Sequence, residues 1–226
     1  MLTSRVIAGL RHAQDPWRPE SRFLRHASGV IHVGANTGQE RFLYRLFGLR
    51  VIWVEPIPEV FARLSSKIAR FSKQRAIQSL VTDRDDQEYE FHVASNNGAS
   101  SSILDFDQHK DIWPEVTYER TIALRSKTLA SLVRDEGIDL DEYDALVIDT
   151  QGSELLVLEG AEPILEHFTY VKAEVPDFES YAGCCKLEDV EAFLTARGFA
   201  EHVRQQFAER SAGGSYYDVV YKREER

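Results

Sequence analysis

Short apolar runs alternate with amphipathic stretches along most of the chain. Continuous apolar runs bounded by turn residues predict strands buried on both faces, and apolar residues spaced three and four apart predict helices. The predicted strands cover 29–35, 50–56, 76–83, 144–150 and 170–176. The predicted helices cover 39–48, 58–71, 127–137, 153–168 and 186–199. Strands and helices in this alternating order favour a parallel sheet with right-handed crossovers.

The middle and the end of the chain depart from this pattern. Residues 87–95 alternate apolar and polar side chains like a half-exposed strand. Residues 96–125 are expected to be an irregular insertion with a further strand near its end. The runs 201–209 and 216–223 flank SAGGS, which is typical of a hairpin. We therefore predict an α/β fold with a doubly wound, mostly parallel sheet that has one antiparallel strand near its end.

Length and composition favour one domain. The chain has 226 residues, 43% of them hydrophobic, which is enough for one sizeable core. With no internal repeat or domain boundary, we expect residues 29–226 to form a single domain preceded by a helical extension over residues 1–28. No apolar run approaches the ~20 residues of a membrane span, and no signal peptide is evident. Adjacent Cys184 and Cys185 have poor geometry for a disulfide, so a reducing cytoplasm is expected.

Charge disfavours nucleic acid as a partner. Lys and Arg number 27 against 37 Asp and Glu, giving a formal net charge of −10. Phosphate backbones are bound by basic surfaces. A local basic face remains open, and Arg18, Arg22, Arg25 and His26 could form one. We expect a small-molecule partner and no membrane or nucleic acid, and we leave open a homodimer.

The motif G34-A-N-T-G38 follows the first predicted strand. Glycines there let the backbone approach a ligand, and the following helix offers unpaired N–H groups. The spacing matches neither the dinucleotide fingerprint nor a phosphate loop. Alone, it fits a plain turn as well as a ligand loop. Glu55 ends the next strand, where a carboxylate can accept hydrogen bonds from a ribose diol, so the whole unit points to an adenosine-containing ligand.

A second acidic position follows the strand 144–150. Asp149 lies at the carboxyl end of this central strand, where an Asp can bind a cationic amine, bind a metal or accept a proton from a hydroxyl. Ser153 is better placed to cap the next helix, and Glu154 lies at the positive end of that helix.

Five stretches, taken in order, resemble the FkbM-type family of S-adenosylmethionine-dependent O-methyltransferases. They are VIHVGANTGQE, WVEP, SNNGASSSIL, SKTLASL and LVIDTQGSELLVLEGAEPIL. The resemblance spans roughly residues 28–200 and implies a Rossmann-like class I methyltransferase fold, in which the seventh strand is antiparallel. It also implies S-adenosylmethionine as the cofactor.

The resemblance implies roles for individual residues. Gly34, Asn36 and Gly38 would line the methionine part of the cofactor, and Glu55 would hold the ribose hydroxyls. Asn97 and Ser101 fall in a segment near the mouth shared by cofactor and substrate. The block after the central strand is matched by Asp149, Gln151 and Glu154.

Two positions depart from the family pattern. The family usually has Asp where this chain has His32, and a Glu where it has Gln151. Both changes remove a carboxylate, which weakens a two-acid metal site, so metal dependence stays open. His32 has three interpretations: a hydrogen-bonded core histidine, a contact to the cofactor's carboxylate or a bridging water, or a general base. The first has the strongest support, because His32 precedes the loop and lies deep.

Methyl transfer to an alcohol needs a base or a metal to take the hydroxyl proton. The candidates are Asp149 and then Glu174, which ends the next strand; Lys172 and His167 are more simply surface residues. The sequence lacks the Pro-Pro-aromatic turn of amine-directed nucleic-acid enzymes, which favours a hydroxyl on a sugar or another small metabolite.

His109, Trp113 and Tyr118 could form a lid or acceptor pocket, or only an exposed loop. A catalytically silent methyltransferase-like binding or assembly protein is the alternative function. The glycine spacing disfavours a nicotinamide-dependent reductase.

Overall fold

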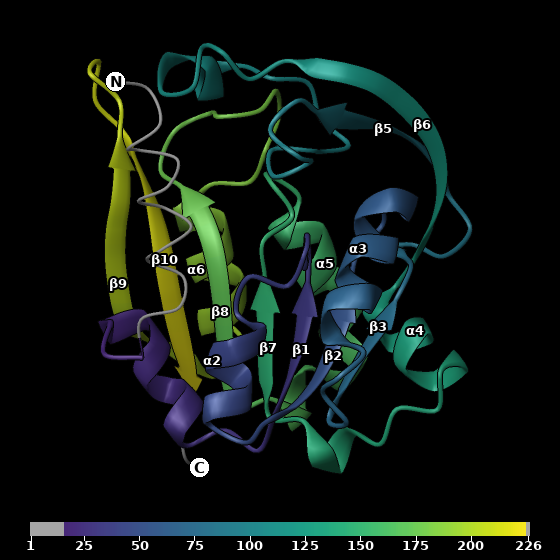
Figure 1. The fold of residues 1–226 in the computed structure, drawn as a ribbon. Helices are drawn as coiled ribbons and strands as arrows, with labels where there is room; N and C mark the ends of the chain where they lie inside the picture. The colour runs from purple at the N-terminus through teal and green to yellow at the C-terminus, as the bar shows by residue number, and fades with distance from the viewer. Residues whose placement is uncertain (1–15, 225–226) are drawn as a thin grey trace.

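Apolar strands at the centre of a seven-stranded sheet organise residues 16–224, which the computed structural model describes (Figure 1). Every residue of β1 (Gly29–Val33) and β7 (Ala145–Ile148) is buried, as continuous apolar runs predict. The other strands of this sheet are β2 (Arg50–Val54), β3 (Gln74–Ile77), β8 (Tyr170–Pro176), β9 (Phe199–Glu209) and β10 (Ser215–Arg223).

The strand order is β3-β2-β1-β7-β8-β10-β9. The chain runs outward from β1 to β2 and β3 and later returns to the other side of β1 as β7, so the order reverses between β1 and β7. In open α/β sheets, ligands bind at the carboxyl ends of the strands at this switch point. β10 is antiparallel to both β8 and β9, which confirms the predicted hairpin and mostly parallel doubly wound sheet.

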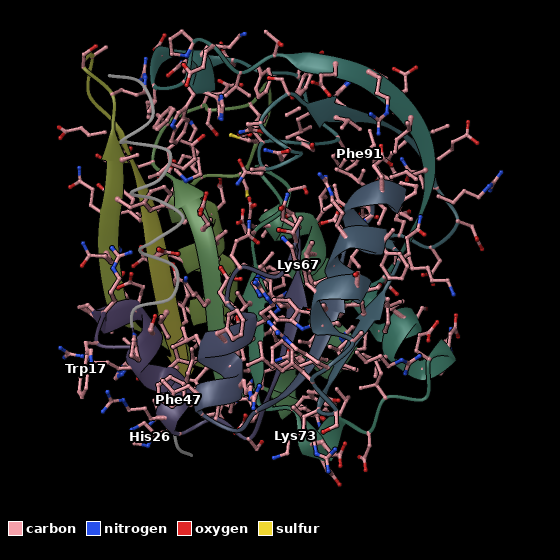
Figure 2. All side chains as sticks on the ribbon, in the orientation of Figure 1. Trp17, His26, Phe47, Lys67, Lys73 and Phe91 are labelled. Atoms are coloured by element: carbon pink, nitrogen blue, oxygen red, sulfur yellow. The ribbon has the colours of Figure 1, made fainter. Side chains whose placement is uncertain are left out.

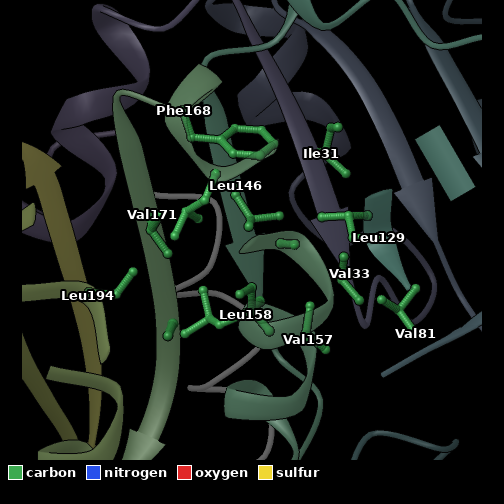
Figure 3. Close-up of a cluster of buried hydrophobic side chains, with 14 of the residues drawn as sticks. Ile31, Val33, Val81, Leu129, Leu146, Val157, Leu158, Phe168, Val171 and Leu194 are labelled. Atoms are coloured by element: carbon green, nitrogen blue, oxygen red, sulfur yellow. The ribbon is translucent and has the colours of Figure 1, made fainter. Parts of the chain in front are cut away.

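Helices cover both faces of the sheet. On one face, β1 side chains Ile31 and Val33 pack with Val157 and Leu158 (Figure 3). Because side chains alternate along a strand, Val30 and His32 point to the opposite face. The helices of the first face are α4 (Leu129–Asp135), α5 (Glu154–Ala161) and α6 (Leu187–Thr195), and those of the second are η1 (Pro19–Arg25), α2 (Arg41–Leu46) and α3 (Pro58–Ile68). The short 3-10 segments η2 (Gln108–Asp111), η3 (Leu140–Glu142) and η4 (Glu162–His167) complete the helical elements.

A second sheet, of three strands, lies over the carboxyl ends of the parallel strands (Figure 1). Its order is β4 (Leu80–Val81), β6 (Tyr118–Lys127) and β5 (Glu88–Ala94). The strand predicted over 76–83 therefore divides between two sheets. The physical reason is that Leu80 packs in a separate apolar cluster with Phe91 and Val93 rather than on the main sheet.

The segment expected to be irregular, 96–125, becomes regular at Tyr118, where β6 begins and pairs with β5. Ile122 and Leu124 recur with a period of two and pack against the same apolar cluster as Phe91. The predicted extension over 1–28 lies largely outside the described residues; within them, η1 packs Phe23 and Leu24 into the core. The domain boundaries themselves stay predictions.

Candidate functional site

Neighbouring strands carry acidic residues at one edge of the sheet. Glu55 and Asp149 directly follow the last residues of β2 and β7, whereas Glu174 of β8 pairs across the ladder with Asp218 of β10. Val33 of β1 pairs with both Val54 and Ile148, so the register brings Glu55 and Asp149 to either side of the chain leaving β1. The acidic residues therefore gather at the carboxyl ends of the strands, at the switch point between β1 and β7.

A cleft of about 100 Å³ that is partly open to solvent lies at this edge. The predicted site residues that line it are His32, Gly34, Asn36, Glu55, Ser101, Asp149 and Gln151. Residues distant in the sequence thus meet at one cleft.

The glycine loop packs against the end of β7. Gly34 has a φ of +82°, and a Cβ there would lie 1.8 Å from the carbonyl oxygen of Asp149, so only glycine fits. The backbone N–H groups of Gly34 and Ala35 both donate to the Val54 carbonyl at 3.0 Å. The side chain of Asn36 accepts a hydrogen bond from the Thr37 N–H at 2.7 Å. These contacts hold the loop in one shape without any ligand.

Gly38 and Asn97 do not line this cleft. A Cβ on Gly38 would lie 2.7 Å from Cδ1 of Leu64, so this glycine lets the loop pack against α3. The Asn97 carbonyl accepts a hydrogen bond from Asn36 Nδ2 at 3.2 Å, and Asn97 lines a separate hollow beside α3. Their predicted roles in cofactor contact stay untested.

Glu55 connects the glycine loop to the end of β2. One carboxylate oxygen accepts from the Asn36 N–H at 2.8 Å, and the other accepts from the Ile57 N–H at 2.9 Å. Burial raises the pKa of Glu55 to about 7, and the nearby charge of Asp149 acts in the same direction. Since an ionised carboxylate has about four acceptor sites, each oxygen can still accept a hydrogen bond from a ligand.

Asp149 and Glu174 are joined through Gln151. Nε2 of Gln151 donates to Asp149 Oδ1 at 2.6 Å and to Glu174 Oε1 at 3.1 Å, and Gln151 Oε1 accepts from the Tyr181 hydroxyl at 2.8 Å. Burial raises the pKa of Asp149 to about 7 and raises that of Glu174 well above its usual value, an effect that the Asp149 charge increases. The pair therefore binds protons near neutral pH. Sequence reasoning missed Tyr181, because no local pattern marks a contact 30 positions away.

Lys172 lies at the acidic edge rather than on the surface, which corrects the expectation from the sequence. Its position in β8 pairs with Val147 and Val220, so it sits within a row of core residues. Nζ forms an ion pair with Asp218 at 2.7 Å, and that carboxylate raises the pKa of Lys172 against the effect of burial. Lys172 thus offsets one of the carboxylates at the edge.

His32 is a buried, hydrogen-bonded histidine at the base of the cleft. Its Nδ1 lies 3.0 Å from the Tyr44 hydroxyl, and its ring stacks on Trp53 with centroids 5.1 Å apart. Burial lowers the pKa of His32 to about 3, and the charge of Lys172 contributes to this decrease. His32 is therefore neutral at physiological pH, which fits the core interpretation and does not test a contact to a ligand.

A pH-dependent stability follows from this neutral histidine. The unfolded chain protonates His32 near pH 6.5, whereas the folded chain resists protonation until about pH 3. Stability from this group is therefore complete above pH 6.5 and decreases by about 1.4 kcal/mol for each pH unit below it. We expect His32→Gln to lose this pH dependence in urea unfolding between about pH 6.5 and pH 4.

Glu55 and Asp149 have raised pKa values, so they stabilise the folded chain as the pH falls and partly mask the effect of His32. The contribution of His32 is therefore read from the difference in unfolding free energy between wild type and His32→Gln at each pH. His202→Gln on exposed β9 is the matched control and should keep the wild-type slope. Parallel pH profiles for wild type and His32→Gln would contradict the assignment.

The turn after β7 is held by Glu154 rather than capped by Ser153. Glu154 Oε1 accepts from the Thr150 N–H at 2.8 Å, and Oε2 accepts from the Gly152 N–H at 3.0 Å. Ser153 instead donates to the Thr150 carbonyl at 3.2 Å. The reason is that Gly152, at a φ of +102°, turns the loop N–H groups toward the buried carboxylate.

The expected lid residues form a packed aromatic group above the acid pair. His109 is fully buried, its Nε2 lies 3.1 Å from the Ser100 hydroxyl, and its ring lies 5.2 Å from that of Tyr181. The rings of Phe106 and Tyr118 stack with centroids 3.9 Å apart. An exposed loop is therefore the wrong description for His109, and the group supports Tyr181 over Gln151.

Within residues 16–224, no three His, Cys, Asp or Glu side chains are grouped so that they could hold a metal ion. The same part of the chain contains no helix with the length and apolarity to cross a membrane.

Apolar Ile57, Leu80 and Phe91 line one end of the cleft, and sequence reasoning missed them as site residues. Phe91 could have been suspected from the alternation of its strand.

Comparisons with solved structures agree with the fold. An uncharacterised protein of Listeria monocytogenes serotype 4b has 9% identity and a TM-score of 0.51, covering 100% of this chain and 70% of that chain. A Streptococcus pneumoniae protein in complex with S-adenosyl-L-methionine has 11% identity and a TM-score of 0.50, covering 100% and 75%. The M1A22 tRNA methyltransferase TrmK of B. subtilis has 12% identity and a TM-score of 0.50, covering 100% and 68%.

The sequence has no match among curated proteins. Residues 32–201 match the methyltransferase FkbM domain, a span that begins in β1, includes the glycine loop, Glu55 and the acid pair, and ends in β9. The match covers more than half of the chain and includes the residues that form the cleft, so this protein belongs to the FkbM methyltransferase family.

Proposed function

We propose that this protein transfers a methyl group from S-adenosylmethionine to a hydroxyl of a sugar or another small metabolite. Family membership supports methyl transfer in general. The observation that carries the proposal is Glu55: a buried carboxylate that lines the cleft, with both oxygens anchored by backbone N–H groups and each able to accept one more hydrogen bond.

The cleft offers complementary surfaces to the parts of this cofactor. Glu55 would accept hydrogen bonds from the ribose hydroxyls, and apolar Ile57, Leu80 and Phe91 would contact the adenine. The loop from Gly34 would face the methionine part. That the S. pneumoniae protein with this fold was solved with S-adenosyl-L-methionine supports the same choice of cofactor.

The acid pair supports a hydroxyl acceptor. In the proposed step, the acceptor oxygen bonds to the methyl carbon as the carbon–sulfur bond breaks and leaves a thioether, and the hydroxyl proton passes to a carboxylate. Asp149 can accept that proton because burial raises its pKa to about 7, close to the pH at which a general base is most effective. Gln151 fixes the orientation of both carboxylates.

Metal assistance is left open. Asp149 and Glu174 supply two oxygen ligands, and Gln151 occupies the position where the family usually has a third carboxylate. A divalent ion bound there would polarise the acceptor oxygen.

The first experiment measures binding of S-adenosylhomocysteine by thermal shift and calorimetry. We expect Glu55→Ala to weaken binding by about 10- to 100-fold, since it removes charge-assisted hydrogen bonds worth about 1.5–3 kcal/mol. Glu55→Gln, which keeps one acceptor oxygen, should lose less. Glu88→Ala on exposed β5 is the control and should bind like wild type.

Equal binding by wild type and Glu55→Ala would overturn the cofactor assignment. A screen over hydroxylated metabolites, with and without Mg²⁺, then tests the reaction. Binding without turnover would favour the catalytically silent alternative, and methylation of amines alone would contradict a hydroxyl acceptor.

A further inference from the structure

Helices α2 and α3 and the turn after α3 present a group of cations, which we name the α2–α3 basic cluster: Arg41 and Arg45 of α2, Lys67 of α3, and Arg70 in the turn that follows α3. The guanidinium groups of Arg41 and Arg70 both lie over the Phe42 ring, at 4.5 Å and 5.2 Å from its centroid. Those of Arg45 and Arg70 both lie over the Phe71 ring, at 5.3 Å and 5.2 Å. Arg70 therefore shares one aromatic ring with Arg41 and another with Arg45.

No carboxylate of the described residues forms an ion pair with any member of this cluster, whereas Arg50 and Arg75 on the adjoining strands both have partners. Electrostatic repulsion between the cations lowers the pKa of two of them. Partial desolvation lowers the pKa of the exposed Lys67, and the charges of Arg41 and Arg63 lower it further. Burial and the charge of Arg70 lower the pKa of Arg41. Grouped like charges reduce stability unless an anion offsets them.

Arg41 supplies a second, independent observation. Its Nη1 donates to the Gly38 carbonyl at 2.8 Å, but its Nε is buried and has no hydrogen-bond partner among the described residues. A buried donor without an acceptor costs about 1–3 kcal/mol. Arg41 therefore brings an unsatisfied donor as well as a positive charge to the cluster.

None of the four cations lines the cleft, but Arg41 directly follows Glu40, which does, and Glu40 and Arg41 influence each other's charge. On α3, Arg63 lies one turn before Lys67, and its charge reaches Glu55. Figure 2 shows Lys67 on α3 in front of the sheet. A ligand in the cleft could therefore extend onto the cluster.

We propose that the α2–α3 basic cluster binds the phosphate groups of a soluble, phosphorylated ligand whose other end occupies the cleft as the methyl acceptor. Assigning that ligand as the acceptor rests on the function proposed above; the anion site itself does not. The ligand class is a phosphate or diphosphate ester.

Several cations in one place favour a phosphate over a single carboxylate, because a phosphate monoester carries about −1.5 to −2 charges and matches the guanidinium fork. A nucleic-acid backbone fits less well. It needs a basic surface that follows many phosphates, whereas this cluster is compact and belongs to a protein with a net charge of −10.

The test uses inorganic pyrophosphate as the probe, measured by calorimetry against NaCl of equal ionic strength, on the full chain with and without S-adenosylhomocysteine. We expect Lys67→Gln/Arg70→Gln to weaken pyrophosphate binding at least about tenfold, since it removes two charged donors. Both side chains are exposed, so the variant should fold. The control, Arg84→Gln/Arg125→Gln, removes the same charge from exposed positions and should bind like wild type.

Three results would overturn the proposal: no pyrophosphate binding by wild type, equal weakening in both variants, or loss of pyrophosphate binding when S-adenosylhomocysteine is present, which would assign the cluster to the cofactor's carboxylate. Binding only to phosphatidylserine vesicles or to single-stranded RNA would also overturn it. Pyrophosphate binding without S-adenosylhomocysteine binding would leave the anion site standing and reject the methyltransferase function. The two failures are therefore distinguishable.

Discussion

Replacing Asp149 with asparagine should lower kcat for methyl transfer by about 10²- to 10⁴-fold, the contribution usual for a general base. The substitution keeps the size of the side chain and an oxygen that can still accept from Gln151 Nε2, so the cleft should keep its shape. S-adenosylhomocysteine binding should change little if the carboxylate acts on the acceptor rather than on the cofactor. The measurement is kcat by single-turnover kinetics with an identified acceptor.

The pH profile separates a lost base from a damaged site. Because burial raises the pKa of Asp149 to about 7, wild-type kcat/KM should rise with pH through that region as the carboxylate ionises. Asp149→Asn should lose this rise. Glu174→Gln, the matched control, removes the neighbouring acid but keeps the Asp149 base, so it should retain the rise near pH 7. Activity of Asp149→Asn within a few-fold of wild type would place the base elsewhere.

The central sheet could be predicted because its signals are local. β7 is a continuous apolar run and β1 is one except for His32, and a strand buried on both faces needs no distant partner to be recognised. Local signals gave the wrong prediction at residues 76–83. One strand was predicted there, but the chain passes from the main sheet to the second sheet after Ile77. The tertiary structure determines which apolar residues a strand packs against, and here Leu80 packs against Phe91 and Val93.

Some features of the site can also be predicted from local sequence signals, and others cannot. Gly34 and Glu55 are marked by their place at strand ends, and the structure brings them to one cleft. Lys172 looked like a surface residue because a strand pattern does not reveal that Asp218 lies within reach. The α2–α3 basic cluster is equally invisible, since it forms only when two helices pack against each other. Residues at strand ends are thus predictable from sequence, and pairings across elements are not.

Gln151 is the position where sequence and structure together allow a further prediction. The family resemblance marks it as a departure, and the structure explains how the chain uses it: one amide group donates to both acids and accepts from Tyr181. Gln151→Glu would remove both donors and bring a third carboxylate to a half-buried acid pair. A fully buried uncompensated charge costs about 3–5 kcal/mol, so the variant should lose up to about that much unfolding free energy above pH 7.

The sign of the pH dependence and a metal rescue make this prediction specific. The new carboxyl should have a raised folded-state pKa, so its penalty should be small at acidic pH and grow as pH rises toward and past that pKa. Three carboxylates also supply hard oxygen ligands, so Mg²⁺ or Ca²⁺ should restore much of the lost stability. Gln151→Met, which removes the donors without adding charge, is the control and should show neither effect. If Gln151→Glu unfolds like Gln151→Met at alkaline pH in EDTA, then Asp149 and Glu174 do not form the closely spaced pair that Gln151 bridges.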